Sequence, residues 1–400
     1  MSRLAAGEWT TARLERFLSS HRPTQLLLKL SARCNIACRY CYWFQDESVY
    51  DRPKNMSADV WRGVLARVDE YFESTHPDTF HVSFHGGEPL LVGKVVFRRM
   101  CLGLRVLASR HHVPLRLSVQ TNGILLDEEW IAICREFDVA IGISLDGDKV
   151  VNDVGRVDFS GKSTHDAVVR AVNLIQHHGL SVGLLAVWTP ASDADSLYRY
   201  FTQELNVRSF DVLLPDHTYD LRGTFGDPFP FYARLFDLWY ETDDSMGTDI
   251  RICSNLLAAL LGSQVNSESL GWGPTTTFAI GTDGRYEILD VMNILGSGAA
   301  RTSSSIWETK LAGVREIPEW KRQVTESVTL SDTCRRCTHK IACGGGYLPS
   351  RWSKSNGFNN SSSHCDTLFR LFEHVRERIE PDLAMLRGLA RDGAPAAILD

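Results

Sequence analysis

The stretch Cys34-Asn-Ile-Ala-Cys38-Arg-Tyr-Cys41 decides how this chain is interpreted. It follows an apolar run, Gln25 to Leu30, that predicts a β-strand. Thiolates are the preferred ligands of iron–sulfur clusters, and three of them at this C-x3-C-x2-C spacing predict a [4Fe-4S] cluster whose fourth iron stays open. An open iron can bind a further molecule, which indicates chemistry rather than electron storage.

The bulk composition limits the class of protein. A chain of 400 residues exceeds the usual size of a single core, which predicts one large domain and a smaller one. The net charge is -6 with no basic tract, so neither nucleic acid nor a membrane surface is expected as a partner. Charged residues interrupt the N-terminal segment, which excludes a signal peptide there and predicts a cytoplasmic protein. In that compartment the ten cysteines are expected to be metal ligands or core residues rather than disulfides.

Short β-rich runs alternate with amphipathic helical patterns from about residue 24, which predicts an α/β fold with a parallel sheet. Ser57 is the expected N-cap of the first helix in this series. The pattern alone leaves a partial barrel and a doubly wound sheet as alternatives. The six predicted strands are Gln25 to Leu30, Phe80 to Phe84, Arg116 to Gln120, Ala140 to Leu145, Ser181 to Val187 and Phe210 to Leu214.

The first cysteine group, with Tyr40 as its aromatic residue, resembles the signature of the radical S-adenosylmethionine (SAM) superfamily. The resemblance implies a partial (β/α)6 barrel and a [4Fe-4S] cluster on Cys34, Cys38 and Cys41 that chelates the methionine part of SAM. In that family, cleavage of SAM gives a 5'-deoxyadenosyl radical, which removes a hydrogen atom from an unactivated carbon.

Further motifs follow the predicted strands, at the edge where parallel-sheet proteins collect functional groups. Gly86-Gly87-Glu88-Pro89, Gln120-Thr121-Asn122-Gly123 and Ser144-Leu145-Asp146-Gly147 resemble the family segments that face SAM. Turn chemistry remains an alternative for Asn122-Gly123 and Asp146-Gly147. Arg156 ends a segment that matches the family's H-D-x-x-R only in part, since asparagine replaces the histidine. The SAM contacts implied are Tyr40, Gly86, Gly87, Glu88, Pro89, Gln120, Asn122, Ser144, Asp146 and Arg156.

A second cysteine group, Cys334, Cys337, Cys343 and Cys365, supplies four thiolates, enough for a second [4Fe-4S] cluster or a zinc site. It resembles the C-terminal SPASM domain of peptide-modifying radical SAM enzymes, which implies an auxiliary cluster. Leu289 and Tyr347 stand where that family has two more cysteines, so we expect no inner cluster and no ligand role for Cys253. Asp290 matches a family aspartate that acts as a base in some members. An ordinary turn aspartate is the alternative for Asp290.

Four segments are therefore expected in the chain. They are an N-terminal segment (1–23), a radical SAM partial barrel (24–230), a bridging region of small hairpins and turns (231–330), and a SPASM-like auxiliary cluster domain with a C-terminal helix (331–400).

The stretch from Cys343 to Trp352 resembles one found in maturases that build cyclophane crosslinks in ribosomal peptides. It implies hydrogen abstraction from a side-chain carbon, followed by a carbon–carbon bond to an aromatic ring. The partners implied are a ribosomal precursor peptide and a reducing electron donor of the flavodoxin or ferredoxin type. About 23 residues before the first strand are too few for a leader-recognition domain, so we expect leader recognition by the barrel and C-terminal surfaces or by a separate leader-binding protein. The alternatives are thioether formation, epimerisation, sulfatase-type oxidation of Ser or Cys, and a non-catalytic binding protein stapled by zinc.

Overall fold

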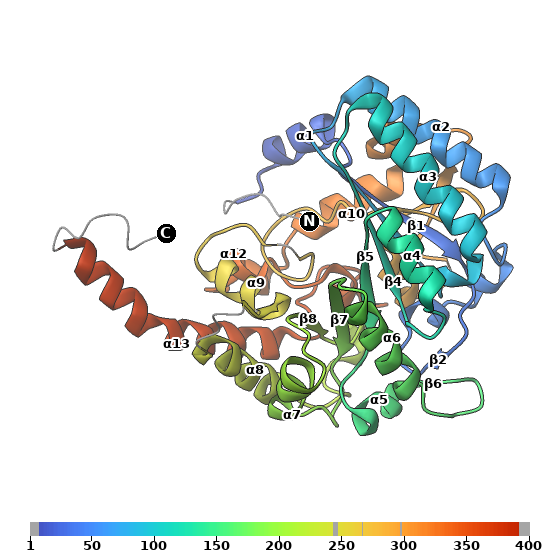
Figure 1. Cartoon of the computed structure of the whole chain (residues 1–400). Helices are drawn as coiled ribbons and strands as arrows, with labels where there is room; N and C mark the ends of the chain where they lie inside the picture. Colours follow the sequence, from blue (N-terminus) through green and yellow to red (C-terminus); the bar gives the residue numbers. More distant parts are fainter. Residues whose placement is uncertain (1–7, 243–246, 266, 297, 392–400) are drawn as a thin grey trace.

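The computed structural model describes residues 8–242, 247–265, 267–296 and 298–391. In this part of the chain the main sheet has the strand order β12-β11-β10-β1-β3-β4-β5-β7-β8-β9 (Figure 1). Neighbouring strands from β10 through β1 to β9 are parallel, which confirms the predicted α/β fold. The six predicted strands correspond to β1 (Gln25–Ser31), β3 (Phe80–Gly86), β4 (Leu115–Thr121), β5 (Val139–Ser144), β7 (Val182–Val187) and β8 (Ser209–Leu213).

Helices connect these strands and lie against the outside of the sheet (Figure 1). The Ser57 side chain caps the first of them, as predicted, by accepting a hydrogen bond from the Val60 backbone N–H. The helices of this half are α2 (Ala58–Thr75), α3 (Lys94–His111), α4 (Glu128–Glu136), α5 (Lys149–Gly155), α6 (His165–His177) and α7 (Ala194–Arg199).

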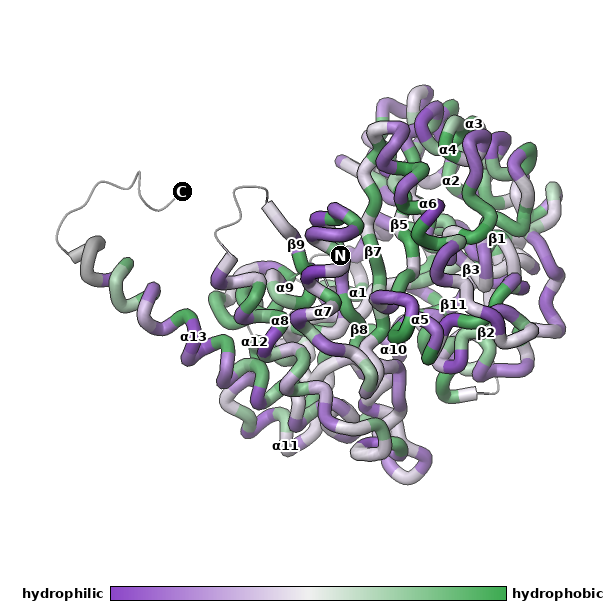
Figure 2. The backbone as a smooth tube through the Cα atoms, turned by 60° about the horizontal axis from the view of Figure 1, so that its bottom comes forward, coloured by the Kyte–Doolittle hydropathy of each residue, from purple (hydrophilic) through white to green (hydrophobic). Residues whose placement is uncertain are grey.

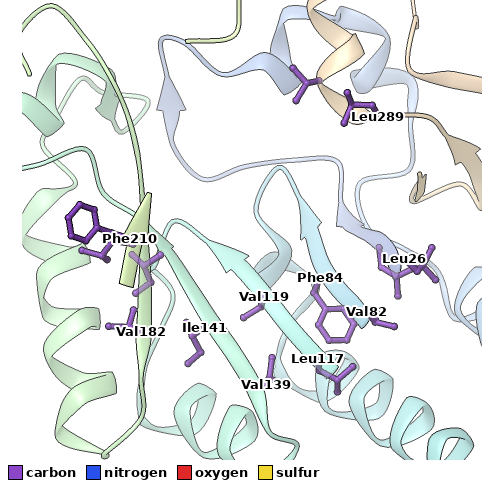
Figure 3. Close-up of a cluster of buried hydrophobic side chains, with 14 of the residues drawn as sticks. Leu26, Val82, Phe84, Leu117, Val119, Val139, Ile141, Val182, Phe210 and Leu289 are labelled. Carbon is purple, nitrogen blue, oxygen red and sulfur yellow. The ribbon is translucent and has the colours of Figure 1, made fainter. Parts of the chain in front are cut away.

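Alternation along β3, β4, β5 and β7 separates the core from the barrel interior. In β3, Phe80, Val82 and Phe84 are buried, whereas the alternating positions His81, Ser83 and His85 are only partly buried. Figure 3 shows the apolar side chains of the neighbouring strands meeting in one layer, and Figure 2 shows the same strands as hydrophobic stretches of the chain. The polar side chains of these strands therefore point away from the helix layer, into the space where a site can form.

The sheet extends beyond the six predicted strands at both edges. At one edge β10 (Ala279–Ile280) pairs parallel to β1, and β11 (Arg285–Glu287) and β12 (Arg301–Ser305) continue it antiparallel. At the other edge β9 (Asp249–Ile250) pairs with β8. The sheet thus continues across the domain boundary that the sequence predicts at residue 230. Among its described residues the bridging region also holds α9 (Arg251–Leu260), α10 (Pro318–Val328) and most of α8 (Phe229–Glu241).

The N-terminal helix of the described chain lies against the bridging region. Helix α1 (Thr11–Ser20) is held there by a hydrogen bond of 2.6 Å from Arg315 Nη1 to the Ser19 carbonyl. The C-terminal part contains α11 (Asp332–Arg335), α12 (Lys340–Cys343) and the long helix α13 (Cys365–Arg391), whose far half projects from the body (Figure 1). None of the helices within the described residues is both long and apolar enough to span a membrane.

Candidate cofactor and substrate site

The first cysteine group lies on the loop between β1 and α2, with all three thiols half-buried. Inside this loop the short strand β2 (Ala37–Cys38) pairs antiparallel with β6 (Arg156–Val157). Burial raises the pKa of Cys34 to about 12 and that of Cys38 to about 11, so the metal-free thiols are protonated at neutral pH. Metal binding at this loop would release protons, as it does wherever thiols become ligands.

Two glycines let the end of β3 approach the cysteine loop closely. A Cβ atom on Gly86, where φ is +136°, would lie 2.3 Å from the Ser31 carbonyl oxygen, and one on Gly87 would lie 2.5 Å from the Arg33 carbonyl oxygen. Only glycine fits at such distances. The backbone N–H groups of Gly87 and Glu88 donate to these same two carbonyls, each at 2.8 Å. The Gly-Gly pair therefore fixes β3 against the loop that carries the cysteines.

The Glu88 carboxylate is a buried hydrogen-bond acceptor. It accepts from the Leu90 backbone N–H (3.0 Å), the Thr121 hydroxyl (2.8 Å) and the Asn122 backbone N–H (2.9 Å). Burial raises the pKa of Glu88 to about 7, while these hydrogen bonds work in the opposite direction. Pro89 follows as the first residue of the short helix η3 (Pro89–Val92). Glu88 thus joins the end of β3 to the end of β4.

Asn122 continues this connection to the cysteines. Its Nδ2 donates to Asn35 Oδ1 at 2.7 Å and lies 3.7 Å from Cys34 Sγ. On the next strands along, Gln120 Nε2 donates to Ser144 Oγ at 3.0 Å. Asn122 thus contacts the cysteine loop, and Gln120 and Ser144 join the neighbouring ends of β4 and β5.

A second buried group surrounds Asp146. Its carboxylate accepts hydrogen bonds from the Tyr40 hydroxyl, from Arg156 Nε at 3.1 Å and from the Val187 backbone N–H at 3.0 Å. Arg156 also places Nη1 3.7 Å from Cys38 Sγ. Tyr40, Asp146 and Arg156 therefore contact each other and the cysteine loop, and their contacts with SAM remain a prediction.

These contacts show that the first site fits an iron–sulfur cluster. Hydrogen bonds to sulfur are among the features by which proteins tune such clusters, and here an amide and a guanidinium each reach one of the three cysteines. The three thiols come from one loop.

Asp290 lies in a buried ion pair behind the cysteine loop, at the start of the short helix η6 (Asp290–Leu295). Its Oδ2 accepts from Lys29 Nζ and, at 2.7 Å, from the Tyr42 hydroxyl. Lys29 Nζ also lies 3.3 Å from His85 Nδ1. Burial alone would raise the pKa of Asp290, but Lys29, His85 and the Tyr42 hydrogen bond lower it to about 2. These neighbours hold Asp290 ionised, and its role as a base remains a prediction.

Sequence analysis missed Lys29, although the chain offers a signal for it. Lys29 stands inside the apolar run Leu-Leu-Leu-Lys-Leu, and a charged residue in such a strand requires a buried partner. The partner lies 261 residues away, so no local pattern identifies it.

Asp216 is a further carboxylate that sequence analysis missed. It lies three residues after β8, at the same edge of the sheet, and is partly buried. Burial and the charge of Asp290 raise the pKa of Asp216 to about 7. Among the described residues, no group donates a hydrogen bond to its carboxylate.

The second cysteine group lines one cavity of about 780 Å³. The four thiols affect one another electrostatically, and burial, followed by the other three cysteines, raises the pKa of Cys343 to about 12. Within the described part of the chain, no three His, Cys, Asp or Glu side chains lie close enough together to hold a single metal ion. Four cysteines on one roomy cavity fit a cluster of several irons, and their ligand roles remain a prediction.

Of the residues directly after Cys343, Gly345 lines this cavity, and its neighbours pack behind it. Gly344 approaches Gly271 so closely that a Cβ would lie 2.1 Å from its carbonyl oxygen. Arg351 is fully buried and donates to backbone carbonyls of Glu326 (3.1 Å), Phe358 (3.0 Å) and Thr329. The Gly-rich stretch and its arginine therefore have a structural role in shaping the second site.

The positions of the missing family cysteines are filled by other contacts. Leu289 is buried and belongs to the hydrophobic core (Figure 3). Cys253 is buried on α9, where Asp211, Asp249 and Asp237 are its charged neighbours. Cys253 thus lies in an acidic environment.

Comparison with known proteins agrees with this geometry. Residues 28–195 match the family model described as the radical SAM superfamily. The chain is 27% identical over 374 residues to a cysteine-type anaerobic sulfatase-maturating enzyme of Clostridium perfringens, covering 89% of this chain and 97% of that protein. It is 34% identical over 168 residues to a serine-type enzyme of Klebsiella aerogenes, covering 41% and 40%.

Among solved structures, native anSMEcpe with bound AdoMet and Cp18Cys peptide matches with a TM-score of 0.80. The sequence identity is 24%, and the match covers 91% of this chain and 99% of that one. This likeness shows the same fold across nearly the whole chain.

Proposed function

From the premise that this chain is a radical SAM enzyme homologous to the anaerobic sulfatase-maturating enzymes, we propose that it closes a carbon–carbon crosslink in a ribosomally made peptide. That it acts on a peptide or protein follows from the homology. Ring closure is supported by one observation, the stretch from Cys343 to Trp352 and its resemblance to cyclophane-forming maturases.

The enzyme uses a [4Fe-4S] cluster and SAM. Cys34, Cys38 and Cys41 would hold this cluster, and Cys334, Cys337, Cys343 and Cys365 would hold an auxiliary one. When bound, the first cluster with SAM supplies a carbon radical that removes a hydrogen atom, and the second supplies a one-electron acceptor.

The chain's own residues prepare the first site before the cofactors bind. Asn122 and Arg156 donate toward the sulfurs of Cys34 and Cys38, and Glu88 fixes the turn that carries Asn122. Because these donors are locked by further hydrogen bonds, the cluster would meet a preorganised environment. Residues at the ends of β4 and β5, Gln120 and Ser144 among them, would then contact SAM.

Sulfatase-type oxidation of a cysteine or serine is the second candidate. The specific observation in its favour is that the similarity to the cysteine-type enzyme covers 97% of that protein. Against it stands the replacement of two family cysteines by Leu289 and Tyr347.

The deciding experiment is intact-mass analysis of a candidate precursor peptide encoded beside this protein, and of a sulfatase-type cysteine peptide. Each is incubated anaerobically with the reconstituted enzyme, SAM and a chemical reductant or a flavodoxin. Ring closure predicts loss of two hydrogens, fragmentation blocked between an aromatic residue and its partner, and no reaction with a hydrazide probe. An aldehyde that the hydrazide captures would replace the crosslink proposal by the sulfatase-type one.

A further inference from the structure

A second cavity, distinct from the one that the four C-terminal cysteines line, opens beside the carboxyl ends of β7 and β8. Its volume is about 290 Å³. Trp188, which lines it, directly follows β7 and donates its backbone N–H to the carbonyl of Leu213, the last residue of β8, at 2.9 Å. Ligands of parallel-sheet proteins bind at this edge of the sheet. The cavity therefore lies where the fold places binding sites.

The loop between β8 and α8 forms one wall of the cavity, and the segment around Cys365 forms another. Hydrogen bonds join the two walls: His364 Nε2 donates to the Pro215 carbonyl at 2.8 Å, and Ser363 Oγ donates to the His217 carbonyl at 3.1 Å. Helix α13, which begins at Cys365, lies beside α8 (Figure 1). The walls are thus fixed to each other before a ligand binds, which lowers the entropic cost of binding.

Three aromatic side chains line the cavity. The rings of His217 and Phe225 are stacked, with centroids 3.3 Å apart and 10° between their planes, yet Phe225 remains 39% exposed. Trp188 is buried, and within the described part of the chain its indole Nε1 has no hydrogen-bond acceptor. A buried donor without an acceptor costs free energy, and aromatic rings pack favourably against one another. These walls therefore suit an aromatic ligand that also carries an acceptor.

The volume of the cavity fits one side chain. An apolar cavity of about 150 Å³ is large enough to bind benzene, and pockets that enclose a drug-sized ligand hold about 300 to 1,000 Å³. The 290 Å³ of this cavity lies between the first value and the lower limit of the second. It can hold one aromatic ring and the atoms that join the ring to a peptide backbone.

The charged residues of the lining favour a ring over a cationic side chain. Both carboxylates of the lining are bound by Arg370, since Asp227 pairs with it and Asp366 Oδ2 lies 3.0 Å from its Nε. Arg222 has no carboxylate partner among the described residues, and its guanidinium lies 4.2 Å from the centre of the Tyr219 ring. A guanidinium that packs on one aromatic ring can pack on another, whereas no free carboxylate awaits a lysine or an arginine.

We propose that this cavity binds an aromatic side chain of the peptide substrate, at a residue other than the one that reacts. No residue of the first cysteine loop lines it, so the bound ring would lie apart from the first site. Trp188, His217 and Phe225 are then specificity-determining residues that hold the peptide while another of its residues reacts. The inference rests on action on a peptide, and it holds whether the product is a crosslink or an aldehyde.

The test compares Phe225→Ala with Phe159→Ala in the holoenzyme. Phe159 is exposed as well, but it lies between β6 and α6 and does not line the cavity, so it is a matched control. With either peptide that the wild type converts, Phe225→Ala should raise KM about 10-fold and leave kcat within about twofold, because the lost contact is made equally in the ground and transition states. Both variants should retain wild-type iron content. A KM of Phe225→Ala within about twofold of that of Phe159→Ala would overturn the inference.

A second series changes the peptide instead of the enzyme. Each aromatic residue of the converted peptide, apart from those that are modified, is replaced by alanine in turn. One replacement should raise the KM of the wild type about 10-fold and change that of Phe225→Ala by less than about twofold, since both changes remove the same contact. The inference fails if no replacement raises the KM of the wild type, or if every replacement acts equally on both enzymes.

The outcome for the ring-closure proposal is separate from this one. An aldehyde in place of a crosslink would end that proposal and leave both comparisons valid. If the wild type converts neither peptide, NMR saturation transfer to N-acetyltyrosinamide decides the case, with N-acetylleucinamide as the non-aromatic control. Transfer to the tyrosine amide should be about fivefold stronger from the wild type than from Phe225→Ala, and equal transfer from the two proteins would overturn the inference.

Discussion

Replacing Lys29 with methionine should destabilise the protein strongly, because it leaves the buried charge of Asp290 without a partner. Lys29 is fully buried, and its Nζ lies 4.8 Å from the centre of the Trp43 ring. Methionine keeps the length of the aliphatic chain and removes the charge, so the change isolates the ion pair from the packing.

Two values bound the expected loss of stability. Removing one partner of a buried pair costs about 3 to 5 kcal/mol. The pKa of Asp290 falls from 3.8 to about 2, which is about 2 units, or about 2.5 kcal/mol in favour of the ionised carboxylate. We expect Lys29→Met to lower the free energy of unfolding by about 3 kcal/mol, a large share of a typical total of about 5 to 15 kcal/mol.

The assay is a double-mutant cycle with Asp290→Asn, followed by anaerobic urea unfolding and tryptophan fluorescence. The double variant carries no unpaired charge, so its loss should fall short of the sum of the single losses by about 1 to 3 kcal/mol. The exposed pair Arg62–Asp59 on α2 serves as the control, where the coupling should be within experimental error. A coupling between Lys29 and Asp290 no larger than that of the control pair would refute the buried-pair reasoning, and with it the fixed charge on Asp290.

Three further predictions concern other parts of the site. In Glu88→Gln an amide replaces the carboxylate that accepts from the Asn122 N–H, so the free energy of unfolding in urea should fall by about 1 to 3 kcal/mol. Equilibrium dialysis should show weaker SAM binding, and an unchanged Kd for SAM would contradict this. Cys365→Ser should lower the iron content from about eight to about four per chain while 5'-deoxyadenosine formation persists, and unchanged iron would remove Cys365 from the ligand set. Asp216→Asn should be more stable than the wild type by up to about 4 kcal/mol at pH 8, since a rise in pKa from 3.8 to about 7 is about 3 units. This difference in the free energy of unfolding should disappear as the pH falls from about 7 to about 4, and urea unfolding at several pH values checks the trend.

The sequence predicted those parts of the fold that depend on local patterns. Each of the six strands alternates or runs apolar within its own few residues, and Ser57 caps its helix through a contact three residues away. The strands β10 to β12 were not assigned to the sheet because their place depends on pairing with β1, more than 240 residues earlier. Sheet edges are set by such long-range pairing, and a two-residue strand carries almost no signal of its own.

For the site, too, the sequence predicted where the polar side chains lie, but not which side chains they contact. The rule that polar residues collect at the carboxyl ends of parallel strands located Glu88, Asn122 and Asp146, and it applies equally to Asp216. Within the sequence, Leu214-Pro-Asp216 has the composition of an ordinary turn, whereas Asp290 stood beside a family motif and was taken as the base.

Chemical role depends on what surrounds a carboxylate, which only the folded chain reveals. Lys29 reaches Asp290 across 261 residues and makes it a permanent anion. Asp216, near that anion and without a described hydrogen-bond donor, is the group whose proton affinity is raised. Because Lys29 holds the charge of Asp290 and that charge raises the pKa of Asp216, a change at Lys29 should alter the pH dependence of stability through Asp216, which the side chain of Lys29 need not touch.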